Sequence, residues 1–269
     1  MLKKRVIFTL LYDSGHFMLS RNFRLQKVGD LFWLQRNYDF SHIAFYIDEL
    51  VVLDVSRSQR DPVRFCETLR ALSKGCFVPI AAGGGVQSVE NARDLLHSGA
   101  DKVVLNSALF HEPGLTVEIS KKFGQQCVVG SVDVKREGDG LFSIYTRNGS
   151  QRLETDPRIA LSQLPSDTIG EIYLNSIDRD GTGAGYTFEL LDLLPSNWSA
   201  PVILAGGVGN SSHLLAGLLD GRIDAAATAH LFNFVGDGLK NARESLLREG
   251  LTLAYWPSLV EAGLSVART

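Results

Sequence analysis

The chain has 269 residues, of which 45% are apolar, 21% are charged and 26 are glycine. This composition is typical of a globular protein and excludes an intrinsically disordered chain and a collagen-like fibre. The formal net charge is -3 and no long run of like charges occurs, so the sequence favours binding neither to nucleic acid nor to a membrane surface.

Short apolar runs rich in valine, isoleucine and leucine recur along the chain, and a polar or glycine-containing turn and a helical stretch follow each of them. The runs lie near residues 5–11, 49–54, 78–82, 102–106, 127–132, 171–176, 201–205 and 224–228. Runs that are apolar throughout, rather than alternating with polar residues, are typical of parallel strands buried on both faces. None reaches the roughly 18 apolar residues of a membrane-spanning helix.

Eight such strand–helix units predict an α/β fold, namely a (β/α)8 TIM barrel. We expect residues 1–250 to form this barrel as a single domain, followed over 251–269 by a C-terminal extension whose role the sequence does not indicate. Helices are predicted over 88–98 and 210–220, because each stretch opens on a suitable N-cap residue and is followed by glycine.

The cysteines and the N-terminus bear on the cellular compartment. Cys66, Cys76 and Cys127 occur at spacings that match no metal or redox motif, so we expect buried thiols in a reducing compartment and neither a metal nor another cofactor. The basic N-terminus superficially resembles a signal peptide, but Asp13 and His16 interrupt the apolar run that follows and no small-residue cleavage site is present. We therefore predict a cytoplasmic protein.

An internal repeat links the two halves of the chain. Shifting the sequence by 122 positions lays residues 79–110 onto 201–232 with many identities, and the same shift lays Leu11 onto Asp133. Barrel units resemble one another in any case, but a constant shift across separate segments favours duplication. We predict a barrel made of two half-barrels related by approximate two-fold symmetry.

Glycine-rich turns end two of the predicted strands and precede helices. Bare glycine amides beside a helix N-terminus can bind an anion, and in this fold such turns lie on the catalytic face. Tight strand–helix turns also need glycine for structural reasons alone. Two phosphate sites would imply a substrate with a phosphate at each end. The residues expected to bind phosphate are Gly84, Gly85, Asn106 and Ser107 at one site, and Asp180, Gly181, Thr182, Gly206, Gly207, Ala229 and His230 at the other.

Several motifs together resemble the cyclase subunit of imidazole glycerol phosphate synthase. The likeness runs from about residue 3 to about residue 250, with motifs at 48–54, 83–85, 99–103, 175–182 and 205–208. The resemblance implies that a glutaminase partner makes ammonia and docks at the N-terminal ends of the strands. It also implies that ammonia crosses the barrel to a substrate with two phosphates at the other end.

The resemblance places two aspartates, a general acid and a general base, at the ends of the first and fifth strands. Asp133 occupies the fifth-strand position, whereas the first-strand position is Leu11, which cannot transfer a proton. The internal repeat aligns the same two residues independently. Asp13 lies two positions further on, roughly 6–7 Å along a strand and beyond hydrogen-bonding reach.

Two further departures from the family concern substrate contacts. Leu19 replaces a lysine that touches substrate in the family, and His230 replaces a small residue at the second phosphate site. Together with Leu11, these residues argue against the ring-closing lyase and cyclase chemistry.

The opposite end of the predicted barrel retains the charged pattern of the family. The resemblance implies an ammonia gate formed by Arg5, Glu49, Lys102 and Glu171. Two positive and two negative side chains that face a barrel interior must pair with one another, because isolated buried charges cost several kcal/mol each. A purely structural ion-pair cluster is the alternative.

Two functions remain open on the sequence alone. A retained gate beside an altered reaction site favours a synthase subunit that receives ammonia from a glutaminase and passes it to a phosphate-bearing acceptor or a downstream enzyme. The chain is similar in this respect to paralogues associated with surface-polysaccharide pathways, in which ammonia becomes an amidino group on a sugar. The alternative is the full cyclase of histidine biosynthesis, with Asp133 as its remaining acid or base. A related phosphosugar isomerase is less favoured, because it needs paired aspartates and no ammonia gate.

Overall fold

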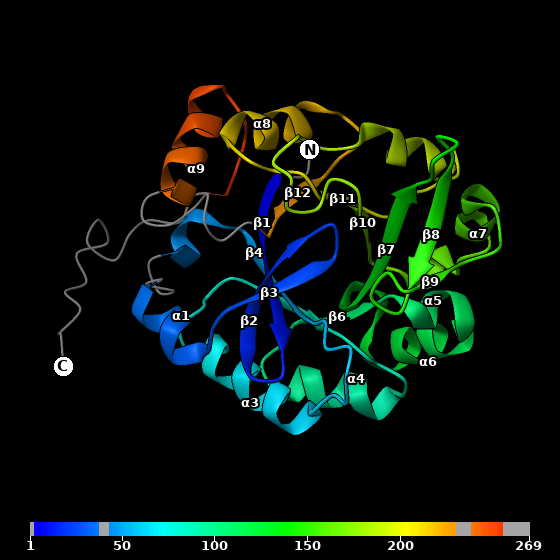
Figure 1. Ribbon diagram of the computed structural model, residues 1–269, viewed down its shortest axis with the longest axis horizontal. Helices are drawn as coiled ribbons and strands as arrows, with labels where there is room; N and C mark the ends of the chain where they lie inside the picture. The colour runs from blue at the N-terminus through cyan, green and yellow to red at the C-terminus, as the bar shows by residue number, and fades with distance from the viewer. Residues whose placement is uncertain (1–2, 38–42, 230–237, 255–269) are drawn as a thin grey trace.

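Eight parallel strands close into a barrel, which confirms the predicted fold (Figure 1). A computed structural model of the chain describes residues 3–37, 43–229 and 238–254. In their order around the barrel, the strands are β1 (Arg5–Asp13), β4 (Glu49–Asp54), β5 (Ile80–Gly83), β6 (Lys102–Leu105), β7 (Val128–Arg136), β10 (Glu171–Ser176), β11 (Val202–Ala205) and β12 (Ala225–Thr228). Parallel pairing of β12 with β1 completes the circle.

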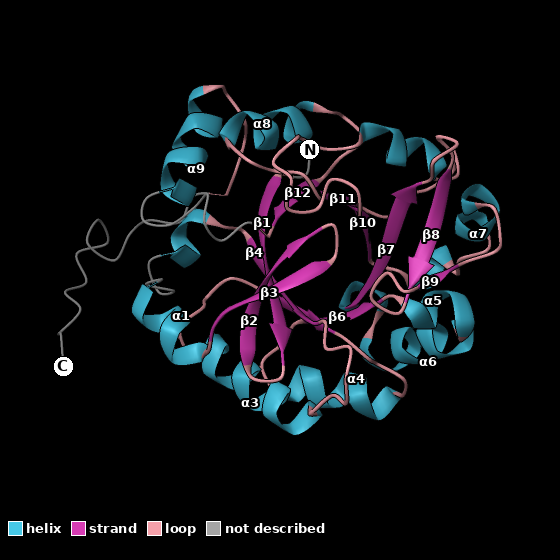
Figure 2. Ribbon diagram, in the orientation of Figure 1, coloured by secondary structure: helices cyan, strands magenta, loops and turns pink. Residues whose placement is uncertain are grey.

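Helices surround the strands on the outside of the barrel, as Figure 2 shows. The α-helices are α1 (Leu31–Asn37), α3 (Pro62–Ser73), α4 (Val89–His97), α5 (Ser107–His111), α6 (Pro113–Phe123), α7 (Pro157–Ser162), α8 (Ser211–Leu219) and α9 (Gly238–Arg248). Short 3-10 helices are η1 (Ala44–Tyr46), η2 (Gln125–Cys127), η3 (Ser166–Thr168) and η4 (Phe188–Leu193). The two helices predicted from their caps are confirmed as α4 and α8, where the side chains of Ser88 and Asn210 accept backbone hydrogen bonds.

Two antiparallel hairpins extend from the barrel at the C-terminal ends of its strands, an end that we call the mouth. They are formed by β2 (His16–Arg21) with β3 (Arg24–Gly29), which continue from β1, and by β8 (Phe142–Thr146) with β9 (Gln151–Arg152), which continue from β7. Asn22, Phe23, Arg147 and Asn148 adopt positive φ at the two hairpin tips, which lets the chain reverse sharply. The expectation that a helix directly follows each of these strands is therefore wrong.

The two halves of the barrel repeat the same strand registers. Leu11 of β1 pairs with Leu53 of β4, and Asp133 of β7 pairs with Asn175 of β10. Each residue of the second pair lies 122 positions after its counterpart in the first pair. The structure thus confirms the two-fold duplication and places Leu11 at the position that Asp133 occupies in the other half.

Two apolar layers hold the barrel together, because successive side chains of a strand point to opposite faces. One layer lies between strands and helices and includes Phe8, Leu50 and Leu174. The other fills the interior of the barrel, which we call the bore, and consists of Ile7, Val51, Ala81, Val104, Val129, Tyr173, Ile203, Ala205, Ala225 and Ala227. The bore is therefore packed, and any passage through it has to run between these side chains.

The cysteines are free thiols, as expected, but they are not all buried. Cys66 and Cys76 are buried, whereas Cys127 is only partly buried. Its thiol donates a hydrogen bond to the carbonyl oxygen of Phe123 at the end of α6.

The C-terminal extension expected over 251–269 falls mostly outside the described residues, so its boundary with the barrel stays a prediction. Within the ranges that the structure describes, no helix is long and apolar enough to cross a membrane.

Candidate active site at the mouth of the barrel

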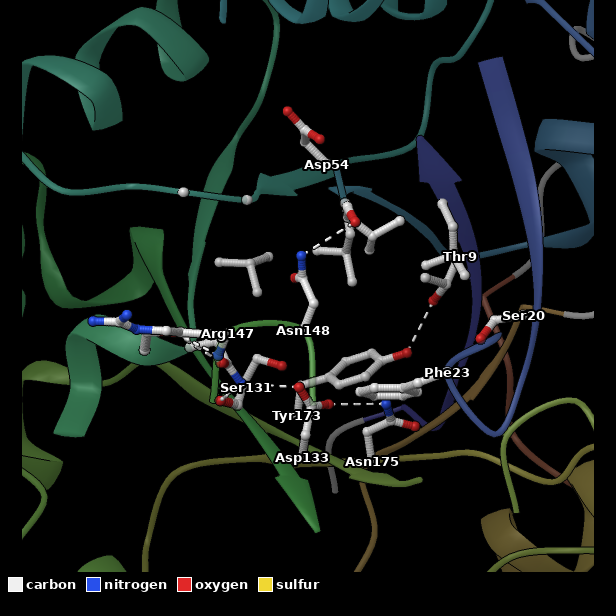
Figure 3. A pocket seen from close by; sticks show the side chains of 18 of the residues that line it. Thr9, Ser20, Phe23, Asp54, Ser131, Asp133, Arg147, Asn148, Tyr173 and Asn175 are labelled. Carbon is white, nitrogen blue, oxygen red and sulfur yellow. Dashed lines mark hydrogen bonds between the residues drawn. The ribbon is translucent and has the colours of Figure 1, made fainter. Parts of the chain in front are cut away.

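A cavity of about 720 Å³ opens at the mouth, and Figure 3 shows part of its lining. Side chains from both half-barrels form its walls, as the fold requires of an active site. The predicted site residues that line it are Gly84, Gly85, Asn106, Ser107, Asp133, Asp180, Gly181, Gly206, Gly207 and Ala229. The structure thus gathers most of the predicted residues around one cavity.

Two predicted phosphate-binding residues do not join this group. His230 lies outside the described residues. Thr182 does not line the cavity, and its hydroxyl donates to the carbonyl oxygen of Arg179 at 2.8 Å and accepts from the N–H of Ala184. The side chain of Thr182 therefore stabilises its own turn.

Asp133 is held in place by two amide donors at the end of β7. The side-chain nitrogens of Asn175 and Asn106 donate to its carboxylate at 3.0 Å and 3.1 Å. Burial raises the pKa of Asp133 to about 7, and the nearby charge of Asp180 adds to the rise, whereas the two amide hydrogen bonds oppose it. A carboxyl group with this pKa can both release and accept a proton near neutral pH, as a general acid or base must.

The equivalent position of the first half has no ionisable group. Leu11 lines the cavity together with Leu53, its neighbour in the sheet. Asp13 is not among the lining residues, and its carboxylate accepts a hydrogen bond from the Ser14 hydroxyl instead. Asp13 therefore does not replace the missing aspartate.

Asp54 is a second carboxylate of the cavity that the sequence interpretation did not single out. It ends β4, is buried, and accepts a hydrogen bond from the Ser56 N–H at 2.9 Å. Burial raises its pKa, against the opposing effects of Ser56 and Arg60. In Figure 3, Asp54 lies across the cavity from Asp133, so the two carboxyl groups do not form a pair. Its position at a strand end, directly before a polar loop, was the signal that could have found it.

A hydrogen bond between Tyr173 and Thr9, which both line the cavity, crosses the bore at the floor of that cavity. The two hydroxyl oxygens are 3.0 Å apart, and both side chains are buried (Figure 3). Burial raises the pKa of Tyr173, which keeps its hydroxyl neutral. Tyr173 lies between Glu171 and Asn175 on one face of β10, so it separates the cavity from the opposite end of the barrel. The sequence interpretation treated this tyrosine as part of an apolar strand.

The glycines of both turns are required by close backbone packing. A Cβ atom on Gly84 would lie 2.3 Å from the carbonyl oxygen of Asp54, and one on Gly206 would lie 2.6 Å from that of Ser176. Both glycines also have positive φ. Strand packing thus accounts for these two residues without a ligand, although it leaves their amides beside the cavity.

Asp180 anchors the β2–β3 hairpin over the mouth. Its carboxylate accepts hydrogen bonds from the Ser20 hydroxyl and from the Phe23 N–H. A Cβ atom on Gly181 would lie 2.0 Å from the Ser20 carbonyl oxygen, so the hairpin rests directly on this turn. Asp180 and Gly181 therefore line the cavity and also support the β2–β3 hairpin above it.

At the mouth, the tip of each hairpin forms hydrogen bonds with the opposite half-barrel. The side chain of Asn22 donates to the carbonyl oxygens of Ile177 and Asp178, and that of Asn148 donates to those of Val55 and Ser56. The two contacted segments lie 122 positions apart, so these contacts of Asn22 and Asn148, which we call the clasp, follow the two-fold symmetry of the barrel. Phe23 and Asn148, at the two hairpin tips, both line the cavity.

The four predicted gate residues form a closed ring of ion pairs at the opposite end of the barrel. Arg5 lies 2.8 Å from both Glu49 and Glu171, and Lys102 lies 2.9 Å from Glu49 and 3.1 Å from Glu171. Burial opposes the charge of Arg5, but Glu171 and Glu49 together raise its pKa above the ordinary value. We call these four residues the charged ring. A molecule that enters the bore here must pass through it.

Comparisons with known proteins identify the family. The model of a family described as histidine biosynthesis protein matches residues 29–236. A protein of Parasynechococcus marenigrum named "Putative imidazole glycerol phosphate synthase subunit hisF2" is 47% identical over 269 residues, which cover 100% of both chains. The imidazole glycerol phosphate synthase subunit HisF of Chlorobaculum tepidum is 38% identical over 254 residues, which cover 94% of this chain and 99% of the relative. The chain therefore belongs to the histidine biosynthesis protein family, among relatives of the HisF-type subunit of imidazole glycerol phosphate synthase.

Proposed function

We propose that this protein receives ammonia from a glutaminase partner at the charged ring and delivers it through the barrel to a phosphate-bearing acceptor at the mouth. The observation that carries the proposal is the contrast between the two ends of the barrel. All four residues of the charged ring are present and paired, whereas the mouth has Leu11 in place of one of two acid–base groups. The residues of the ammonia entrance are thus retained, whereas the residues of the family's reaction site are altered.

The charged ring suits a neutral molecule better than an ion. Its four groups balance one another, so an ammonium ion would lose its hydration there without a net attraction to replace it, whereas uncharged ammonia loses far less. Hydrophobic side chains would stabilise this end of the barrel at least as well as buried ion pairs do. A transport role explains why charges are kept there, and the static cluster remains the competing interpretation.

An aromatic pair beside the charged ring supports the docking of a partner on this face. Phe45 in η1 and Phe77 just before β5 both precede barrel strands, and their ring centroids are 4.8 Å apart. The side chain of Phe77 is 50% exposed. Exposed aromatic residues are enriched at protein interfaces, so we propose this face as the docking site of the glutaminase.

Asp133 is the proton-transfer group that we propose for the reaction at the mouth. When ammonia adds to an electrophilic carbon of the acceptor, the new nitrogen must lose a proton, and the Asp133 carboxylate can take it. We propose a sugar of a surface-polysaccharide pathway as the acceptor, and the free thiols of the three cysteines fit the cytoplasm as the compartment.

The full cyclase of histidine biosynthesis is the second candidate. The intact hydrogen bonds of Asp133 and the 38% identity to a HisF subunit over almost its whole length favour it. Leu11 and Leu19 speak against it, because neither side chain can exchange a proton or pair with a phosphate.

Two measurements test the proposal. Calorimetric titration with the glutaminase subunit of the same organism should show a complex that Phe77→Asp abolishes and Phe32→Asp leaves intact. Phe32 is a matched control because it is 70% exposed and lies in α1, directly after the β2–β3 hairpin at the mouth. A folded protein that does not bind the glutaminase would refute the proposal.

The second measurement is turnover of the phosphoribulosyl substrate of the cyclase with excess ammonium salt at mildly alkaline pH. This condition bypasses the glutaminase. We expect no product. Product formation would establish the full cyclase instead and would show that Asp133 suffices without a second aspartate.

A further inference from the structure

Three arginines line one end of the cavity. Arg57 and Arg60 come from the loop after β4, and Arg147 comes from the tip of the β8–β9 hairpin. Near them lie two turns, one with Gly84 and Gly85 and one with Asn106 and Ser107, which together we call the first cradle. The sequence interpretation of the phosphate sites included none of these arginines.

Arg60 and Arg147 are each held near the first cradle by a specific contact. The backbone N–H of Arg147 donates to the Ser107 hydroxyl at 3.1 Å, and the Asn148 clasp fixes this tip to the segment just before Arg57. The stem of Arg60 packs over Gly85, since a Cβ atom there would lie 2.8 Å from its Cδ. Two separate loops thus bring their cations to the same place.

The guanidinium groups of Arg60 and Arg147 are poorly satisfied within the protein. The Arg60 Nε is buried without a hydrogen-bond partner, and Asp54 is 3.9 Å from it, beyond hydrogen-bonding distance. Among the described residues, the Arg147 guanidinium has no ion pair or hydrogen bond. Arg57 donates to the Phe23 carbonyl oxygen at 2.6 Å and has further N–H groups to offer. Arginines that converge on a cavity with free donors are suited to an anion.

The other end of the cavity has a different charge. Gly181, Gly206, Gly207 and Ala229 form what we call the second cradle, and no lysine or arginine side chain among the described lining residues packs on its glycines. Arg179 is close to Gly207, but it does not line the cavity and donates to the Ala184 carbonyl oxygen.

The repeat makes this asymmetry explicit. Arg179 is the counterpart of Arg57, and Thr182 is the counterpart of Arg60, at the 122-position shift. The sequence of residues 230–237, which lie outside the described residues, contains no lysine or arginine. The duplicated barrel therefore carries two unlike cradles.

The number of cations exceeds what one phosphate needs. A single phosphate can be bound by the backbone amides of the first cradle, and the arginines lie beyond those amides at the rim. Asp54 and Glu112 also line the cavity, but the three arginines outnumber these two carboxylates. The balance at the rim remains positive.

We propose that the first cradle and its three arginines bind a diphosphate group, and that the second cradle takes the less charged end of the same molecule. The proposal deepens the proposed function, because it names the chemistry of the phosphate-bearing acceptor. One phosphate occupies the glycine turn, and the second lies between Arg57, Arg60 and Arg147, whose planar groups form paired hydrogen bonds with phosphate oxygens.

Calorimetric titration of the full chain with inorganic pyrophosphate and with inorganic phosphate, at one fixed ionic strength, tests the proposal. Pyrophosphate should bind at least about tenfold more tightly than phosphate, since it gains charge-assisted hydrogen bonds to the arginines. Arg60→Gln and Arg147→Gln should each weaken pyrophosphate binding by about tenfold and change phosphate binding by much less. Arg248→Gln, on the exposed surface of α9, is the matched control and should change neither affinity.

Arg60→Lys guards against a general effect on folding, because it keeps the charge and loses only the paired geometry. Its affinity for pyrophosphate should lie between those of the wild type and Arg60→Gln. Equal affinities of the wild type for phosphate and pyrophosphate, or unchanged pyrophosphate binding in both glutamine variants, would overturn the proposal. None of these titrations involves the glutaminase, so loss of the partner complex and loss of the diphosphate site are separate results.

Discussion

The two halves of the mouth have the same strand registers but different side chains. In the second half, Asp133 lies between two asparagine donors, whereas in the first half the equivalent position is Leu11 beside Leu53. Thr228 is the counterpart of Asn106 at the 122-position shift. The surroundings of Leu11 thus lack both the carboxylate and the two amides that are present around Asp133.

This difference indicates that the strand pairing of the barrel does not depend on the polar network. A carboxylate that burial keeps partly protonated costs stability, and a leucine at the same register costs none. The half without the network still forms the same strand pairs. The network around Asp133 therefore supports the proton transfer that we propose for this residue.

Replacement of the one retained carboxylate should give the largest effect. Because the folded pKa of Asp133, about 7, is raised above its unfolded value, wild-type stability that is present below the unfolded pKa is lost as pH rises towards 7. Asp133→Asn should remove that loss and be more stable than the wild type at pH 8, by up to about 4 kcal/mol, with little difference near pH 3. Urea unfolding at both pH values measures this. Equal pH profiles for the two proteins would contradict the raised pKa.

Leu11→Asp should make the two halves more alike in sequence but not in stability. The new carboxylate would lie beside Leu53 without amide donors, so we expect a cost of about 3 kcal/mol at pH 8 and a smaller cost at pH 5, where it is protonated. Leu11→Asn separates polarity from charge and should show no such pH dependence. A cost below about 1 kcal/mol at both pH values would mean that the first half is as polar as the second.

The Tyr173–Thr9 hydrogen bond is a second difference between the halves, since the counterparts of these residues are Val51 and Ser131. Tyr173→Phe leaves the buried Thr9 hydroxyl without this partner and should cost about 1–2 kcal/mol of unfolding free energy. Ser131→Ala is the matched control and should cost less. A double-mutant cycle with Thr9→Val should show strong coupling, and additive effects would refute the contact.

The clasp of the two hairpins should behave symmetrically, with the smallest effects. Asn22→Gly and Asn148→Gly keep the positive φ but remove the side-chain donors, so each should cost about 1 kcal/mol. Hydrogen exchange of amides in the β2–β3 and β8–β9 hairpins measures the loss locally. Unequal losses would show that one hairpin is fixed mainly by other contacts, such as those of Asp180 with the β2–β3 hairpin.

Much of the fold follows from local sequence patterns. Continuous apolar runs predict parallel strands buried on both faces, and the 122-position shift predicts which residues are equivalent. The hairpins were missed because polar and glycine residues follow the apolar runs of β1 and β7, as they do where a turn leads into a helix. The turn residues Asn22 and Asn148 were the available signal for those hairpins.

The candidate site likewise has some features that the sequence predicts and others that only the structure shows. The resemblance to the family led us to expect Asp133, the missing partner at Leu11 and the four charges of the ring. The 122-position repeat aligned Leu11 with Asp133 independently. The elevated pKa of Asp133, the contact of Tyr173 with Thr9 and the convergence of the three arginines could not be predicted from the sequence. Each of these depends on loops or strands that are distant in sequence and meet only in the closed barrel, where burial and neighbouring donors decide what a side chain does.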